Sequence, residues 1–459
     1  MIILSGTLLH LTYQNPDNHY TVARLKIPKI SEPVTVVGHL AGVIEGENLE
    51  VSGTWSAHPK YGDQFKVETY KVMLPESTSG IRRYLGSGII AGIGKSLADK
   101  IVDHFQEQTL EMIENDPDQL LKIQGIGRHK KQAIEQAWNQ HHAVRRVMQF
   151  LQENSVSVYH AAMILKLYGT KAMELLQANP YLIVRDLPEI GFTIADRIAL
   201  KNGTGREDEN RLQACLIHSL ISAEQDGHVY LFKTQLFQAA ARVAGVPASV
   251  FEPALTLLKD SGEIKICDDA ADTQVYLKRL FTAESGIANR IRAILSMPKK
   301  TFQVSEEEIL DNILNRLAVK LSEEQLKVVA GVMEERIVVI TGGPGTGKTT
   351  LIRALCELFS LRHLKVVLSA PTGRAARRLS QVTGKKASTL HKLLGFDHEN
   401  QTFERHRANP LDLDLFIVDE ASMVDTILMY RLFDALPVTA GVIIVGDTFQ
   451  LPSVGPGNV

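Results

Sequence analysis

A glycine-rich stretch, Gly342-Gly-Pro-Gly-Thr-Gly-Lys-Thr349, constrains the fold of this chain more than any other feature. It matches the pattern G-x-x-x-x-G-K-[ST] at every fixed position. A short apolar run precedes it at 336–341, and a run with apolar residues at helical spacing follows at 350–358. Because a strand, a glycine loop and a helix start form a phosphate-binding loop in this order, the sequence predicts an α/β domain that binds a nucleotide.

The residue types in this loop suit ATP and Mg²⁺. Glycines let successive backbone N–H groups curve around phosphate without a Cβ clash. Lys348 is predicted to bind the β- and γ-phosphates, and Thr349 to hold Mg²⁺. Gln325 could present its amide to adenine, or it could be an ordinary surface glutamine. The predicted nucleotide-binding residues are Gln325, Gly342, Gly343, Pro344, Gly345, Thr346, Gly347, Lys348, Thr349 and Thr350.

Two later strand ends carry side chains suited to phosphate chemistry. The apolar run 415–418 ends in paired carboxylates, of which Asp419 is predicted to ligate Mg²⁺ and Glu420 to orient the attacking water as a general base. The run 442–446 leads into a loop where Gln450 is predicted to sense the γ-phosphate. The predicted catalytic residues are therefore Lys348, Asp419, Glu420 and Gln450.

Composition limits the possible classes of protein. A net charge of −2, with 44% hydrophobic and 22% charged residues, is ordinary for a globular chain, so a nucleic-acid surface must be a local patch. The cysteines Cys215, Cys267 and Cys356 lie far apart, which favours a reducing cytosol over disulfides or zinc. Apolar runs shorter than about 18 residues predict no membrane span, and the first residues lack the basic region of a signal peptide.

Shifts in pattern divide the chain into four regions. Residues 1–75 contain apolar, β-rich runs separated by turns, which suits a small OB-like barrel. Residues 76–205 change to helical periodicity, and residues 206–300 predict three helices and a hairpin, typical of a winged-helix-like module. In 301–459, apolar runs with little polar alternation predict a parallel sheet covered on both faces, the core of a RecA-like P-loop domain.

For two of these regions the sequence allows either DNA binding or a purely structural role. The aromatic residues of the barrel either stack on bases or belong to its core: Tyr13, Tyr20, Trp55, Tyr61, Phe65 and Tyr70. The predicted hairpin of 206–300 carries three acids at its tip that would repel phosphate: Asp268, Asp269 and Asp272. Such a module either binds DNA or serves only to pack domains together, and the acids disfavour direct DNA contact by the hairpin.

The region 76–205 repeats a Gly-x-Gly turn followed by an amphipathic helix. Copies lie at 90–101 and 121–134, and a weaker one at 187–198 has Glu189 in place of the first glycine. These units resemble helix–hairpin–helix motifs, in which backbone N–H groups at a helix start bind a DNA phosphate independently of base sequence. The DNA contacts predicted here are Gly92, Gly94, Lys95, Gly125, Gly127, Arg128 and Lys130.

Local charge supports DNA binding at two places. The segment 122–147 contains one acidic residue, Glu135, and six Lys or Arg residues. These basic residues form either a DNA-backbone patch or a solvated helix face: Lys122, Arg128, Lys130, Lys131, Arg145 and Arg146. Downstream, a strand end at 369–373 leads into a basic helix. There Thr372, Arg374 and His391 are predicted to contact single-stranded DNA, as are Arg377 and Arg378 unless they form surface salt bridges.

The ordered motifs resemble those of superfamily 1 DNA helicases of the RecD-like type. They are Ser322-Glu-Glu-Gln325, the loop 342–350, Ala370-Pro-Thr-Gly-Arg374, Ser388-Thr-Leu-His-Lys-Leu-Leu394, Val418-Asp-Glu-Ala-Ser422 and 445–457. The order of modules before them is similar to that of the longer RecD-like proteins. The resemblance implies an ATP- and Mg²⁺-dependent helicase that moves 5′ to 3′ on single-stranded and forked or duplex DNA. It also implies a nucleoid-associated role in the bacterial cytosol in repair and recombination, and a strand-parting insertion at 392–411.

The chain departs from the family after the Gln450 element. The family continues into a second RecA-like domain with an arginine that stabilises the transferring phosphate, whereas this sequence stops at Val459. We therefore expect these 459 residues to bind ATP–Mg²⁺ and DNA but to hydrolyse ATP slowly and not to translocate. The alternative is an ATP-switched DNA-binding adaptor. A conjugative relaxase is disfavoured because the histidines in 1–75 lack H-x-H spacing.

Overall fold

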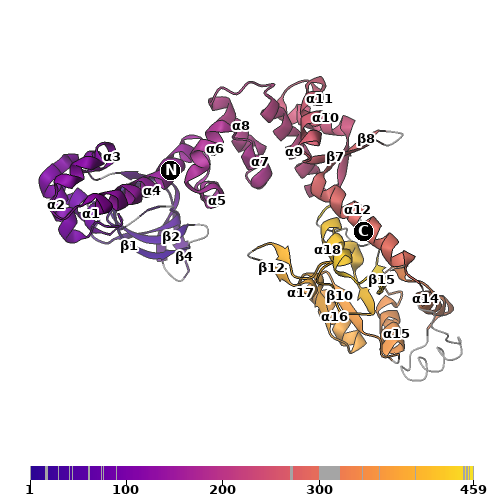
Figure 1. Ribbon diagram of the computed structural model, residues 1–459. Coiled ribbons are helices and arrows are strands. Elements are labelled where there is room, and N and C mark those ends of the chain that lie inside the picture. Colours follow the sequence, from indigo (N-terminus) through magenta and orange to yellow (C-terminus); the bar gives the residue numbers. More distant parts are fainter. Residues whose placement is uncertain are drawn as a thin grey trace. The chain divides into compact units, whose positions relative to one another are not determined.

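The computed structural model describes the whole chain except residues 1, 16–18, 29, 41, 44, 60–61, 74, 76, 89, 269–271, 299–320, 344, 361, 399, 448–449, 451–452, 454 and 458–459. It divides into two compact units, 1–214 and 215–459 (Figure 1). Each unit has its own buried apolar core. Tyr61, Asp269 and Pro344, which the sequence singled out, lie outside the described residues.

The first unit begins with a closed barrel in the order β1-β2-β3-β5-β4. Its strands are β1 (Ile2–Gln14), β2 (Tyr20–Lys26), β3 (Val34–His39), β4 (Asn48–His58) and β5 (Gly62–Met73). β3 and β5 pair in parallel, and the other neighbours are antiparallel. Phe65 and Tyr70 point into the core, whereas Tyr13, Tyr20 and Trp55 are exposed. The OB-like barrel is confirmed, and base stacking by Phe65 or Tyr70 is excluded because both are buried.

Helices complete the first unit. They are α1 (Thr78–Gly86), α2 (Lys95–Phe105), α3 (Thr109–Asn115), α4 (Arg128–Glu153), α5 (Val158–Tyr168), α6 (Ala172–Ala178), α7 (Leu182–Asp186) and α8 (Gly191–Lys201). Isoleucines flanking the first two Gly-x-Gly turns share one core with Trp138 of α4: Ile90, Ile93, Ile123 and Ile126. The two turns are therefore parts of one packed module.

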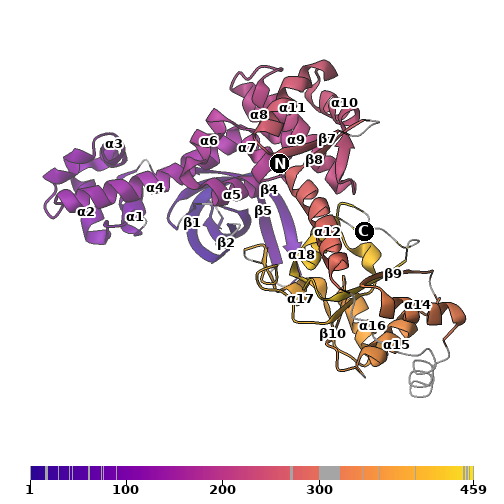
Figure 2. The same cartoon turned by 45° about the vertical axis from the view of Figure 1, so that its right-hand side comes forward.

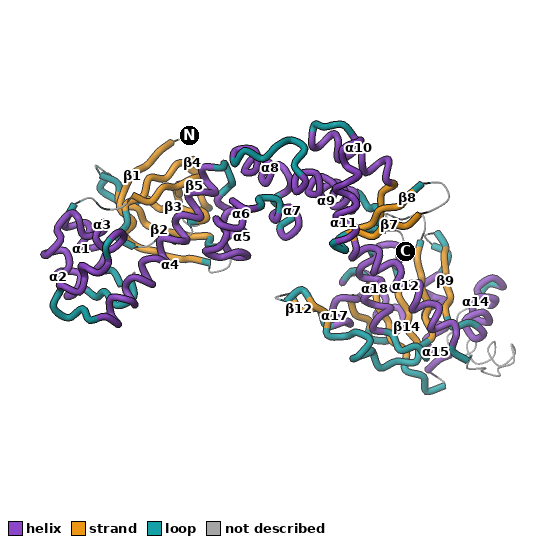
Figure 3. Tube along the Cα trace, turned by 45° about the horizontal axis from the view of Figure 1, so that its top comes forward, coloured by secondary structure: helices purple, strands orange, loops and turns teal. Residues whose placement is uncertain are grey.

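A buried ion pair joins α4 to the barrel, beside which α4 runs in Figure 3. Arg145 donates to Glu47, whose side chain is 1% exposed. Removing one partner of such a pair leaves a buried charge uncompensated, so we expect Arg145→Met to cost about 3–5 kcal/mol of unfolding free energy. Both tryptophans of the chain, Trp55 and Trp138, lie in this unit, so urea denaturation of the full chain followed by tryptophan fluorescence measures this loss.

Arg146→Met is the matched control, because Arg146 is the adjacent residue on α4 and is exposed. We expect Arg146→Met to lower the unfolding free energy by less than about 0.5 kcal/mol. If Arg145→Met lowered it no more than this, the ion pair would have no structural role. Replacing both partners with apolar residues, Arg145→Met with Glu47→Leu, should recover much of the loss, because no unpaired charge then remains.

The second unit starts with a winged-helix arrangement. Its elements are α9 (Glu209–Gln225), β6 (Tyr230–Phe232), α10 (Lys233–Ala244), α11 (Glu252–Asp260), β7 (Ile264–Asp268) and β8 (Thr273–Leu277). α9 crosses the boundary between the two units. The three helices and the hairpin match the sequence prediction. The short strand β6 was not predicted; it completes a sheet of order β6-β8-β7.

The phosphate-loop domain is a parallel sheet of order β11-β10-β14-β15-β9. Its strands are β9 (Ile337–Thr341), β10 (Val366–Ala370), β11 (Ala387–Thr389), β14 (Leu415–Val418) and β15 (Gly441–Gly446). Its helices, with the preceding α12, are α12 (Lys278–Ser296), α14 (Glu323–Glu334), α15 (Lys348–Ser360), α16 (Gly373–Thr383), α17 (Leu390–Leu394) and α18 (Thr426–Ala435). The predicted α/β layer is confirmed.

Helices cover both faces of this sheet (Figure 2). Residues of α14, α15 and α16 pack on one face, and residues of α12, α17 and α18 on the other. β14 is buried along its whole length, with Ile417 in the first cluster and Phe416 and Val418 in the second. This two-sided burial explains why the strands show no polar alternation in the sequence.

Helix α12 belongs structurally to the phosphate-loop domain, although the sequence placed its residues in the preceding module. Ile294 lies in the core beneath the sheet. Arg290 donates to the main-chain oxygens of Phe433, at 3.1 Å, and of Leu436. The ring of Tyr430 lies where a Cβ on Gly286 would fall. The winged-helix elements and the phosphate-loop domain are therefore joined by packed side chains as well as by the chain itself.

Candidate functional site

The phosphate loop connects β9 to α15. Gly345 and Gly347 have φ of +81° and +83°, a backbone conformation that L side chains rarely adopt. The side chain of Thr346 donates to Gly343 O at 3.0 Å, which closes the turn. The described glycines therefore have the conformation that a phosphate-cradling loop needs, and α15 begins at Lys348, directly after them.

Lys348 points back into its own loop. Its Nζ donates to Gly342 O and, at 2.9 Å, to Gly343 O, and lies 3.5 Å from Asp447 Oδ2. Asp447 is 1% exposed and also accepts from Gln450 Nε2 at 3.3 Å. The structure thus brings Gln450 to the phosphate loop, as predicted, and Asp447 is the buried carboxylate that links it to Lys348.

The paired carboxylates follow β14. Burial raises the pKa of Asp419, while the Glu420 N–H, which donates to it at 2.9 Å, and the charges of Lys348 and Arg378 oppose that rise. Glu420 has φ of +55°, unusual for a non-glycine residue and typical of strain held at a functional site. Its Oε2 is buried without a hydrogen-bond partner among the described residues. A partly buried acid with a raised pKa and an unsatisfied carboxylate oxygen fit a site that takes a cation and a water.

These groups enclose one pocket of about 370 Å³ at the carboxyl edge of the sheet. Its walls include the loop with Lys348 and Thr349, the acids Asp419 and Glu420, and Gln450. Gly343, Gly345, Thr346, Gly347 and Thr350 also line it. Three residues of α16 line it as well: Ala375, Arg378 and Val382. A loop of backbone N–H groups, two cations and two acids suit a nucleoside triphosphate with Mg²⁺.

Gln325 is placed next to the loop but with its amide already engaged. Nε2 donates to Thr346 O at 3.1 Å, and Oε1 accepts from Ser322 N at 3.1 Å as part of a capping box. In this structure the amide therefore braces the phosphate loop. Binding of adenine through both amide atoms would require these contacts to be exchanged.

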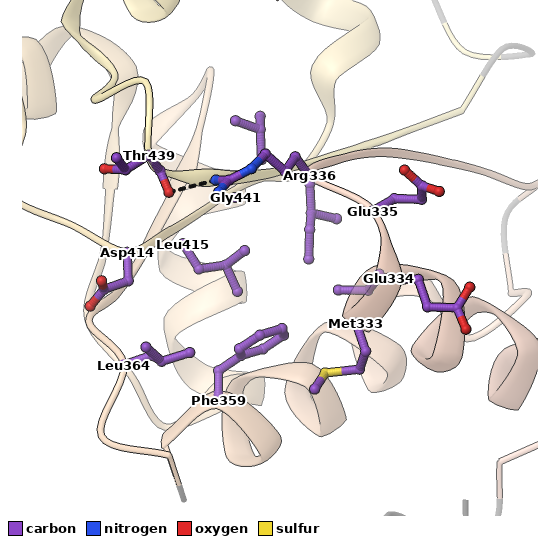
Figure 4. Close-up of a pocket in the computed structure, with 13 residues that line it drawn as sticks. Met333, Glu334, Glu335, Arg336, Phe359, Leu364, Asp414, Leu415, Thr439 and Gly441 are labelled. Carbon is purple, nitrogen blue, oxygen red and sulfur yellow. Dashed lines mark hydrogen bonds between the residues drawn. The ribbon is translucent and has the colours of Figure 1, made fainter. Parts of the chain in front are cut away.

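A second cavity lies at the opposite edge of the same sheet, where β9, β14 and β15 begin (Figure 4). Its wall includes Phe359, Leu364 and Leu415, and Arg336 Nη1 donates to Thr439 O at 2.8 Å beside it. Its acids are Glu334, Glu335 and Asp414. These carboxylates, in a mainly apolar setting, disfavour phosphate, so the nucleotide site is the pocket at the carboxyl edge.

The first two Gly-x-Gly turns have nearly identical geometry. Gly94, which precedes α2, has φ/ψ of −95°/173°, and Gly127, which precedes α4, has −94°/175°. Neither helix start has a side-chain cap, so its first N–H groups remain available to a ligand. Gly92 and Gly125 have φ of +94° and +101°. The third copy differs, because Ile190 before α8 is already in the helical region at −75°/−33°.

Internal ion pairs reduce the basic patch inferred for 122–147. Lys131 Nζ lies 2.7 Å from Asp118 and 3.2 Å from Glu135, and Arg145 is paired with Glu47. The exposed basic residues that remain are Lys122, Arg128, Lys130 and Arg146. Sequence counting overlooked Asp118 and Glu47 because both lie outside the window. The patch is smaller than predicted and lies closer to the second turn.

The basic helix downstream is α16, and the structure separates its arginines. Thr372 caps α16 by accepting from Ala375 N at 3.2 Å. Arg374 and Arg377 are exposed and lie outside the nucleotide pocket, whereas Arg378 lines it. Arg378 therefore faces the nucleotide pocket, and contact of the three arginines with DNA stays a prediction.

His391 is exposed on α17 beside a short hairpin, β12 (Phe396–Asp397) and β13 (Thr402–Phe403). Its ring centroid lies 5.3 Å from that of Phe396, which is 4.8 Å from that of Phe403. The hairpin lies within the segment 392–411, to which the resemblance assigned strand parting. In the wing β7–β8, Asp272 Oδ2 accepts from Thr234 at 2.8 Å, so this acid has a structural partner.

Three family models match the chain. They are described as "ATP-dependent DNA helicase YrrC, OB-fold domain" at 1–75, "ATP-dependent RecD2 DNA helicase HHH domain" at 140–230 and "AAA domain" at 325–456. The second match begins after both Gly-x-Gly turns, within α4. No helix in the described part of the chain has the length and apolar character needed to span a membrane.

Curated relatives agree with these models. The chain is 31% identical over 457 residues to "ATP-dependent RecD2 DNA helicase" of Deinococcus radiodurans, covering 96% of this chain and 63% of that protein. It is 38% identical over 213 residues to "RecBCD enzyme subunit RecD" of Haemophilus influenzae, covering 40% of this chain and 33% of the relative. It is also 38% identical to "ATP-dependent DNA helicase dda" of phage T4, over 26% of this chain and 29% of the relative.

Proposed function

The chain belongs, over the residues it spans, to the RecD2-type helicases, and from this premise we propose that it acts as an ATP-dependent DNA helicase. The observation that carries the proposal is the convergence of Lys348, Asp419, Glu420 and Gln450 on one pocket. A phosphate-binding loop with two acids suits ATP hydrolysis, and a glutamine beside it can respond to the loss of the γ-phosphate by moving its own loop.

Each group in the pocket has a proposed task. Lys348 leaves its loop carbonyls to bind the β- and γ-phosphates. Thr349 and Asp419 would hold Mg²⁺, which would supply positive charge near the phosphates when bound. Glu420 accepts a proton from the attacking water through its unsatisfied Oε2. Gln450 contacts the γ-phosphate and, through Asp447, links its loss to Lys348.

DNA is proposed to bind at two surfaces. Single-stranded DNA binds next to Thr372, Arg374 and His391, which leaves the β12–β13 hairpin placed to part strands. Duplex phosphates bind the two Gly-x-Gly turns through backbone N–H groups, aided by Lys95, Arg128 and Lys130. The proposed direction is 5′ to 3′, and the proposed setting is repair and recombination.

Strand displacement on forked duplexes tests the function. Joined to a second RecA-like domain, these residues should separate a labelled duplex that has a 5′ single-stranded tail when ATP and Mg²⁺ are present, and should not separate one with only a 3′ tail. If only the 3′-tailed substrate were separated, the direction of movement would be 3′ to 5′ instead. ATP-dependent changes in DNA affinity without any strand displacement would favour the ATP-switched adaptor.

The salt dependence of duplex binding tests the helix–hairpin–helix surface. Because Arg128 and Lys130 are exposed, replacing both with alanine should weaken binding without affecting folding. Each lost phosphate contact should lower the slope of log affinity against log salt by about one. Fluorescence anisotropy with duplexes of unrelated sequence measures this slope. An unchanged slope would remove these two side chains from the proposed DNA surface.

A further inference from the structure

Helix α16 forms a wall of the nucleotide pocket with one of its faces. The residues that line the pocket, Ala375, Arg378 and Val382, lie three and four positions apart, which places them on one side of a helix. The adjoining side, about 100° further round the helix, is buried against the domain through Ala376, Leu379 and Thr383. The orientation of α16 is thereby fixed by its packing, and Arg378 is the charged residue of the face toward the phosphate loop.

Arg378 has the properties of a side chain that awaits an anion. It is exposed, and it forms no hydrogen bond or ion pair with any residue that the structure describes. Arg374 and Arg377 of the same helix also have no such partner among the described residues, so Arg378 differs from them by lining the pocket. The guanidinium of Arg378 is therefore available for a ligand.

The charge of Arg378 acts at the triphosphate end of the pocket. Arg378 lines the same pocket as Lys348 and as Asp419, the acid proposed to hold Mg²⁺. Lys348 approaches from α15 and Arg378 from α16, two helices that pack against each other on the same face of the sheet. A triphosphate seated on the loop would thus share its pocket with two cationic side chains, Lys348 and Arg378.

Building on the proposed function, we propose that Arg378 binds the terminal phosphate of ATP. Arg378 belongs to the same domain as the phosphate loop. Its planar guanidinium can donate two parallel hydrogen bonds to phosphate oxygens, which a lysine cannot. ADP lacks the phosphate that it would bind. Arg378 therefore distinguishes ATP from ADP, whereas the loop glycines and Lys348 also contact the phosphates that the two nucleotides share.

Equilibrium titration of fluorescent ATP and ADP analogues in the presence of Mg²⁺ tests the proposal on the full chain. Arg378→Ala should weaken ATP binding about ten- to a hundredfold, the effect of losing charge-assisted hydrogen bonds. ADP binding should change less than about threefold, because no contact to ADP is lost. Arg378→Lys should fall between the wild type and Arg378→Ala for ATP, because charge remains but the planar fork does not.

Arg377→Ala is the matched control, since Arg377 is the adjacent residue on α16, is exposed and does not line the pocket. It should leave both affinities unchanged. The proposal is overturned if Arg378→Ala binds ATP as tightly as Arg377→Ala does, or if it weakens ATP and ADP equally. A wild-type chain that binds neither nucleotide would instead refute the proposed function. Retained ADP binding by Arg378→Ala shows that the variant is folded.

Discussion

Replacing Lys348 with alanine is expected to abolish measurable ATP binding while leaving DNA binding intact. Lys348 is the cation that the phosphate loop holds in place, with its Nζ on Gly342 O and Gly343 O. The variant loses two charge-assisted phosphate contacts of about 1.5–3 kcal/mol each. Affinity should therefore fall about 10²- to 10⁴-fold. Titration with a fluorescent ATP analogue measures this loss, and fluorescence anisotropy with labelled duplex measures DNA binding.

Lys327→Ala provides the control for Lys348→Ala, because Lys327 is an exposed lysine of α14 outside the pocket. It should leave ATP affinity unchanged. Equal ATP affinity in Lys348→Ala and the wild type would show that the nucleotide does not occupy this pocket. Loss of DNA binding along with ATP binding would show that the Gly-x-Gly turns, which lie in the other unit, do not bind DNA independently.

The second large effect is expected from Glu420→Gln. The change keeps the size of the side chain but removes its ability to accept a proton, so DNA-stimulated ATP hydrolysis should fall about 10²- to 10⁴-fold. ATP affinity should change little, because Lys348, Thr349 and the loop glycines remain. The rate of phosphate release, measured at saturating ATP with and without single-stranded DNA, tests this expectation against the wild-type chain.

Glu324→Gln, at an exposed position on α14, controls for the loss of one acidic charge and should hydrolyse ATP as the wild type does. If Glu420→Gln also retained the wild-type rate, another group would have to activate the water. If it lost ATP affinity instead, the unsatisfied Oε2 of Glu420 would be serving nucleotide binding rather than proton transfer.

Regular local patterns made much of the fold predictable. The strand–loop–helix of 337–360 is encoded in adjacent residues, and the three helices predicted within 206–300 are present as α9, α10 and α11. The barrel strands follow β-rich runs bounded by turns. The strand β6 was missed because its three residues are too few to show a periodicity.

Charge counting along the chain was less reliable than motif spacing. Lys131 and Arg145 were assigned to a DNA patch, yet each is paired within the fold, Arg145 with a residue of the barrel loop. Likewise, Phe65 and Tyr70 were grouped with the exposed aromatics as candidates for base stacking, yet both are core residues. A window along the sequence includes neighbours in the chain, whereas ion pairing and burial depend on neighbours in space.

The sequence by itself determined which chemical groups this protein has and the local elements that present them: the phosphate loop, the acids after β14 and the Gly-x-Gly turns. Only the tertiary structure decided that Arg378 lies in the nucleotide pocket while Arg377 does not, that Asp447 links Lys348 to Gln450, and that α12 completes the core under the sheet. The physical reason is that hydrogen-bonded turns and helices depend on residues close in sequence. The direction in which a helix face points is set by packing between residues distant in the chain.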